Sequence, residues 1–236
     1  MTSASDRDSL LGLITKQQDG LVDLCLIINR LGDNFRPILQ SISSDNRLKI
    51  LQIQDSESGW TILHYTVYNS DAETVEMILD CVSKEERYIL LSAQARLTRT
   101  PIHHACLVDN SRVLGLLIRL LKEETWYELL QITDVIGFTP LHSTALSGQT
   151  QAISTIADSL TAQQLIHLLR ITDNFGRTPL QRAESAGMHA AAKLLKDYRT
   201  KALIDIALQQ ADQTGSNFKL KTNFSCVQVW FQIHCY

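Results

Sequence analysis

Residues 138–148 read FTPLHSTALSG, and two other segments repeat this phrase with small changes. They are RTPIHHACLVD at residues 99–109 and RTPLQRAESAG at residues 177–187. With a weaker copy, TILHYTV, the threonines of the phrase lie 39 residues apart, at Thr61, Thr100, Thr139 and Thr178. A constant period between about 20 and 50 residues is typical of a stacked solenoid, in which each unit buries its apolar face against its neighbours. The sequence therefore predicts a row of similar units.

Two antiparallel helices are predicted in each unit. Threonine before proline and an apolar run favours a helix start, because the hydroxyl accepts from a free backbone N–H and proline lacks a donor that would go unused. First helices are therefore expected to begin at Pro101, Pro140 and Pro179. Gly148 and Gly187 suit the left-handed residue that ends a short helix. The second helix carries apolar residues at helical spacing on more than one side, so we expect it to be buried.

A third, shorter helix is predicted in each unit by another set of residues that recurs every 39 positions, namely Ser44, Ser83, Lys122 and Thr161. Ser83 with Glu86, and Thr161 with Gln164, have the spacing of a capping box, in which two side chains satisfy each other's free backbone donors. Tight loops are expected to close the units, since TDVIGF (133–138) and TDNFGR (172–177) combine aspartate and glycine. The segment AQARLTR (93–99) departs from this loop pattern.

Composition and charge restrict the function classes. The chain has 236 residues, of which 44% are hydrophobic and 20% charged, enough to bury a core. Its net charge of -3 and lack of a Lys/Arg cluster argue against binding of nucleic acid. The N-terminus lacks the order of a secretion signal, and no apolar run reaches the roughly 18 to 20 residues of a membrane span. Five scattered cysteines without a CxxC pair indicate reduced thiols. We expect a monomeric cytoplasmic protein, with the nucleus as an alternative, and no cofactor or metal.

The repeated phrase resembles the T-P-L-H-x-A phrase of the ankyrin repeat, which has a period of about 33 residues. Thr139, Pro140, Leu141 and His142 match it in full, and Ala145 lies one position late. The other units match in part. Six additional residues per unit are the departure from the family, and the third helix would account for them.

This resemblance implies an all-α, ankyrin-like solenoid of helix-turn-helix repeats with an extra short helix per repeat, and it allows short β-hairpin loops. Residues 1–35 are expected to form atypical N-terminal capping helices, and residues 36–212 the repeat domain. Within that domain, residues 198–212 would be the closing helix. Residues 213–236 leave the repeat and are expected to be a flexible tail.

One histidine recurs in the first three units, as His64, His103 and His142. Adjacent units are about 8 to 10 Å apart, whereas zinc binds nitrogen at about 2.0 to 2.1 Å, so these side chains cannot share one ion. The resemblance implies instead that each bonds the threonine and nearby backbone. His104 should point about 100° further round the helix, toward the exposed side. No enzyme motif is present, although a site assembled across units, with His104 or Cys106 as its reactive group, stays an alternative.

Binding of a protein partner is the function we expect, with no catalytic activity, as in an adaptor or scaffold. Loop positions next to the threonines carry aromatic, apolar and arginine residues that are typical of interfaces, and the family's inner helical surface adds further positions. The predicted partner-binding residues are Trp60, Tyr65, Leu97, Arg99, His104, Ile136, Phe138, Phe175, Arg177 and Arg182. If the third helix folds under the loops, the apolar ones among them are core residues instead. A regulatory segment of a larger signalling or membrane protein is another alternative.

Overall fold

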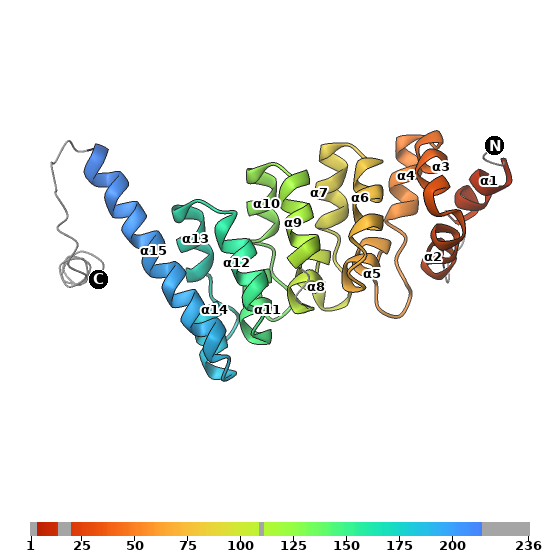
Figure 1. Cartoon of the computed structure of the whole chain (residues 1–236). Helices are drawn as coiled ribbons and strands as arrows, with labels where there is room; N and C mark the ends of the chain where they lie inside the picture. The colour runs from red at the N-terminus through yellow and green to blue at the C-terminus, as the bar shows by residue number, and fades with distance from the viewer. Residues whose placement is uncertain (1–3, 14–19, 109–110, 214–236) are drawn as a thin grey trace.

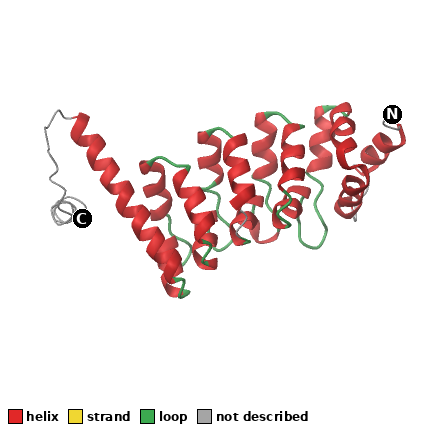
Figure 2. Ribbon diagram, in the orientation of Figure 1, coloured by secondary structure: helices red, strands yellow, loops and turns green. Residues whose placement is uncertain are grey.

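The protein is described by a computed structural model that covers residues 4–13, 20–108 and 111–213. This part of the chain consists of helices and loops and holds no strand, which confirms the all-α prediction (Figures 1 and 2). None of its helices is long and apolar enough to cross a membrane. Two 3-10 helices cover Gly32–Asn34 and Arg96–Thr98. The α-helices are α1 Ala4–Leu13, α2 Gly20–Leu31, α3 Phe35–Ser41, α4 Ser44–Leu51, α5 Ile62–Tyr68, α6 Ala72–Asp80, α7 Lys84–Leu91, α8 Pro101–Leu107, α9 Ser111–Leu120, α10 Glu123–Leu129, α11 Pro140–Ser147, α12 Thr150–Asp158, α13 Ala162–Arg170, α14 Pro179–Ser185 and α15 His189–Gln213.

The helices form similar units that stand side by side along the molecule (Figure 1). The first unit is α5–α7, the second α8–α10, the third α11–α13, and the fourth is α14 with the start of α15. First helices contact first helices, in the order α5, α8, α11 and α14, and second helices do the same in the order α6, α9, α12 and α15. Third helices α7 and α10 also touch. The residues between the helices form one continuous apolar core.

The first helices begin where the sequence predicts. Pro101, Pro140 and Pro179 are the first residues of α8, α11 and α14, and the preceding threonine caps each helix. Gly148 ends α11 in the left-handed conformation, with φ of 72°. The predicted capping boxes also form at the starts of α7 and α13. Local sequence therefore fixes where most helices of a unit start.

The fourth unit differs from the others because its second helix continues through the positions where a separate third helix would begin. The expected closing helix at 198–212 is part of α15, which runs without a break from His189 to Gln213. In the third unit, Thr161 and Gln164 form the capping box that starts a new helix. The corresponding residues are Thr200 and Leu203, and leucine has no side-chain acceptor; the Thr200 hydroxyl donates to Lys196 O within the helix instead. The predicted tail lies, apart from Gln213, outside the described residues.

The loops between units form a second row, joined by backbone hydrogen bonds. The N–H groups of Arg96, Val135 and Asn174 each donate to the loop before, at Ser58 O, Leu97 O and Ile136 O, over 2.9 to 3.1 Å. Gly137 has φ of 80°, and a Cβ there would lie 2.7 Å from Asn174 N. Only glycine fits this close approach. The loops are therefore held in register with the helices.

The loop before Thr100 keeps the shared conformation despite its different sequence. Ala95 N–H donates to Arg99 O, as Asp134 N–H donates to Phe138 O in the next loop. Thr98 occupies the position of Gly137 and takes a left-handed φ of 54°, next to Leu97 at 62°. Left-handed backbone is strained for a β-branched residue. The stacking of loops thus imposes on this one a conformation that its own residues do not favour.

Candidate functional site

The histidines of the repeated phrase join each unit to the next. His103 Nδ1 accepts the backbone N–H of Thr100 at 3.2 Å and lies 2.8 Å from its hydroxyl. Because Nδ1 is an acceptor, Nε2 carries the hydrogen and donates to Phe138 O of the following loop at 2.9 Å. His64 and His142 make the same bonds, to Arg99 O and Arg177 O. The hydrogen bonds that were expected to the threonine and nearby backbone are therefore present. The hydrogen bond from each histidine to the loop of the next unit was not predicted.

Burial keeps these histidines neutral. It lowers the pKa of His64 and of His103 to about 4, more than the hydrogen bonds to backbone carbonyls raise it. Burial also lowers the pKa of His142. A neutral ring can accept at Nδ1 and donate from Nε2 at the same time, whereas a protonated ring can only donate. The bonding pattern therefore requires the neutral form, and we assign these residues to the scaffold.

Two predicted contact residues, Leu97 and Phe175, lie exposed on the loops, with 57% and 70% of their surface accessible. Ile136, at the same unit position, is half-buried, while its neighbour Val135 is 48% exposed. Sequence reasoning missed Val135 because alignment by unit position pointed to Ile136. The third helix therefore does not bury the whole apolar loop edge.

The expected exposure of Phe138 is wrong. Its side chain is 3% exposed and stacks on His142, with ring centroids 5.5 Å apart. Arg182, from the next unit, lies with its guanidinium carbon 5.0 Å from the Phe138 ring centroid. The following unit therefore covers Phe138, which belongs to the core between units.

The position of His104 on its helix predicted an exposed side chain, and this prediction is also wrong. The side chain is 8% exposed because rings of the first unit cover it. Trp60 packs edge-on against it at 4.8 Å between centroids, and Tyr68 lies 6.3 Å away. Burial lowers the pKa of His104 to about 3. Tyr68, which sequence reasoning did not select, and predicted Tyr65 are both exposed, while Trp60 is half-buried.

Arginines and buried aspartates lie together beneath the loops. Arg99 Nε is 3.3 Å from Asp134 Oδ2, and Asp134 Oδ1 accepts two backbone N–H groups of its own loop. Arg182, on α14, pairs with Asp173 of the loop between the third and fourth units. Burial raises the pKa of Asp173, but bonds from Arg182 and the loop backbone outweigh it, so this pKa is lowered. Arg177, in contrast, is exposed. The two aspartates were treated as turn residues in the sequence, and their ion pairs could not be foreseen.

In the described part of the chain, three buried side-chain atoms have no hydrogen-bond partner, and all three belong to first helices of the units. They are His104 Nε2, Ser143 Oγ and Arg182 Nη2. Each residue is four positions after the threonine of its unit, so the three lie on consecutive first helices, α8, α11 and α14. A buried polar atom without a partner is uncommon and needs an explanation. We call these residues, with Tyr65 at the same position of the first unit, the inner row.

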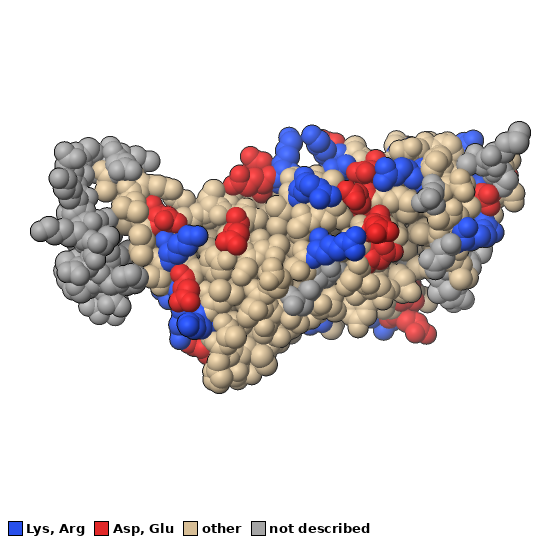
Figure 3. Space-filling model, in the orientation of Figure 1, with Lys and Arg blue, Asp and Glu red and all other residues tan. Residues whose placement is uncertain are grey.

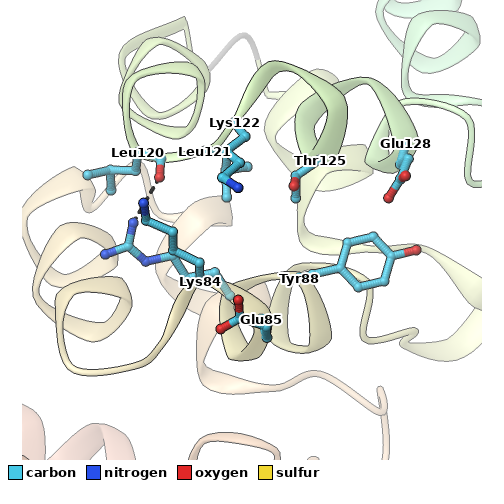
Figure 4. A pocket seen from close by; sticks show the side chains of 9 residues that line it. Lys84, Glu85, Tyr88, Leu120, Leu121, Lys122, Thr125 and Glu128 are labelled. Carbon is cyan, nitrogen blue, oxygen red and sulfur yellow. Dashed lines mark hydrogen bonds between the residues drawn. The ribbon is translucent and has the colours of Figure 1, made fainter.

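Other features offer weaker sites. A hollow between α7 and α10 is lined by Lys84, Glu85, Tyr88, Lys122 and Glu128 among others (Figure 4). Its arginine, Arg87, is already engaged, donating to Leu79 O and to Leu120 O of the next unit. Figure 3 shows charges of both signs over this part of the molecule, whereas the surface around α11 and α12 carries few. The hollow is therefore best explained as a seam between third helices.

Chemistry that would mark an enzyme is limited in the described part of the chain. It holds no group of three or more His, Cys, Asp or Glu side chains placed to bind a metal ion. Cys106 is fully buried, and burial raises the pKa of its thiol. A buried thiol with a raised pKa is a poor nucleophile.

Comparison of the sequence with models of known protein families gives no match, and comparison with curated proteins gives none either. The function of this chain must therefore be inferred from its own residues and their geometry.

Proposed function

We propose that this chain is an ankyrin-like solenoid that acts as a non-catalytic protein-interaction module, an adaptor or scaffold. Support for the ankyrin likeness comes from the repeated threonine and histidine, which close a capping box at the start of α5, α8 and α11. The third helices α7, α10 and α13 account for units longer than the family's usual period. We also propose that the protein works in the cytoplasm.

The observation that carries the proposal is the exposed edge formed by the loops. Leu97, Val135 and Phe175 present apolar side chains there, on backbone that is bonded from loop to loop. Exposed Tyr65 and Tyr68 extend this surface on the first unit. Apolar and aromatic side chains held on a rigid frame lose little conformational freedom on binding. We call this surface, together with the inner row, the loop face.

The alternative of an enzyme with a site across units finds less support. Its candidate residues were His104 and Cys106, and both are buried. No feature of the described residues favours the alternative of a regulatory segment in a larger protein.

Affinity capture from cell lysate, followed by mass spectrometry, tests the proposal. The variant carries Leu97→Asp and Phe175→Asp, two exposed positions whose change should leave the fold intact. The matched control carries Ile89→Asp and Leu208→Asp, which are 40% and 41% exposed and lie on α7 and α15. We expect specific partners to be lost with the loop variant and retained with the control. Partners retained equally by both would contradict binding through the loop face.

A further inference from the structure

Two unpartnered atoms of the inner row, His104 Nε2 and Arg182 Nη2, lie next to side chains that are only partly buried. Trp60, which is half-buried, lies over His104. Arg182 lies between the rings of Phe138 and Phe175, 5.0 and 5.1 Å from their centroids, and Phe175 is largely exposed. Rotamer changes of such side chains are common when an interface forms. A partner that moves Trp60 or Phe175 aside would reach hydrogen-bonding groups that are otherwise left without a partner.

Charge along the loop face is uneven from unit to unit. The loops and helix starts of the second to fourth units carry four arginines and two aspartates, namely Arg96, Arg99, Arg177, Arg182, Asp134 and Asp173. Both aspartates are buried in pairs with Arg99 and Arg182, so the exposed charge belongs to Arg96 and Arg177. The loop of the first unit instead carries Asp55 and Glu57. Arg96 reaches back to this acidic loop, where its Nη2 donates to Ser56 O. The exposed loop charge at the fourth unit is therefore the positive charge of Arg177, although the whole chain has a net charge of -3.

The spacing of the inner row suits an extended chain. Neighbouring helices pack about 8 to 10 Å apart, and an extended backbone advances about 3.3 Å per residue. About three residues of a partner would thus cross one unit, and about twelve would cross all four. A segment of that length could contact the rings of the first unit and the arginines of the fourth at once.

We infer that the loop face binds an extended, acidic segment of a protein partner. An apolar residue of this segment packs on Trp60 and Tyr68, and acidic side chains about nine residues away pair with exposed Arg177 and accept from Arg182 Nη2, the nitrogen that has no partner. A backbone group of the segment, close to the apolar anchor, bonds His104 Nε2. The inference rests on the proposed function and adds the chemistry and the direction of the partner.

Selection from a displayed library of random peptides, each about twelve residues long, tests the inference. The intact chain is the bait, and selected peptides are synthesised and their affinities measured. We expect enrichment of peptides with Asp or Glu at one end and an apolar or aromatic residue at the other. Reversal of the exposed charge in Arg177→Glu should weaken their binding about tenfold, through loss of an ion pair and added repulsion. Lys201→Glu, an exposed site on α15, is the charge-matched control and should have little effect.

Three results would overturn the inference: no enriched peptides, enriched peptides that are neutral or basic, or acidic peptides that bind Arg177→Glu as tightly as the unchanged chain. Arg177→Gln removes the charge without repulsion and should give an intermediate affinity. Failure here is distinct from failure of the proposed function. If lysate partners still depend on Leu97 and Phe175 while selected peptides are not acidic, the loop face binds proteins and only the chemistry of the partner is wrong.

Discussion

Acid should destabilise the protein because its buried histidines must be protonated on unfolding. The share of one histidine in this loss of stability can be measured with a single substitution. The unfolded chain protonates histidine near pH 6.5, whereas His64 and His103 in the folded chain have a pKa of about 4. Between these values the unfolded state binds more protons, so stability is fully present above pH 6.5 and is lost as pH falls toward 4. Linkage gives a loss of about 2 kcal/mol per histidine at about pH 5.

His103→Gln isolates one of these contributions. Gln181 shows that glutamine can replace the ring in the capping box, since its Oε1 accepts Thr178 N–H at 2.9 Å. The variant should lose the bond to Phe138 O and about 0.5 to 1.5 kcal/mol of stability near neutral pH, because this carbonyl loses one of its two donors and keeps the N–H of Asp134. It should also lose about 2 kcal/mol less than the unchanged chain between about pH 7.5 and about pH 5. At about pH 5 the variant should therefore be at least as stable as the unchanged chain.

Urea unfolding followed by circular dichroism at several pH values measures both effects. His189→Gln, at an exposed histidine on α15, is the control and should keep the pH dependence of the unchanged chain. Equal loss of stability in acid for His103→Gln and the unchanged chain would refute the assignment of a neutral, buried His103.

Three further predictions concern the scaffold. Thr98→Gly should raise the unfolding free energy by about 1 kcal/mol, since it relieves left-handed backbone at a β-branched residue; a lower denaturation midpoint would contradict this. Arg87→Met should cost about 2 to 4 kcal/mol, because Leu79 O and Leu120 O lose a charged donor, whereas Arg112→Met, in an exposed pair with Glu73, should change the midpoint little. Cys106 should resist iodoacetamide in the folded chain and react in urea, as its thiol is fully buried; labelling of Cys106 without denaturant, detected by mass spectrometry, would count against the packing described.

Helix starts were predictable because they depend on residues close in sequence. Pro140 and the Ser83 capping box were found from the sequence, since a cap and its helix lie within one turn. The course of α15 was not foreseen, although the signal is local. Leu203 stands where a third helix would need Glu or Gln to close its capping box.

Exposure of the candidate site was less predictable because it depends on the neighbouring unit. Leu97 and Phe175 are exposed as expected. Phe138 is buried by Arg182 of the following unit, and His104 by Trp60 of the preceding one. A position on the helical wheel carries no information about a ring contributed by another unit. The three unpartnered atoms of the inner row likewise became visible only once the units were placed together.

Amide hydrogen exchange, with and without a captured partner, tests most directly whether the loop face binds protein. We predict that the partner slows exchange in the loops at 93–99, 132–138 and 171–177 and in helices α8, α11 and α14. Slowed exchange confined to the third helices α7, α10 and α13, with unchanged loops, would contradict the account.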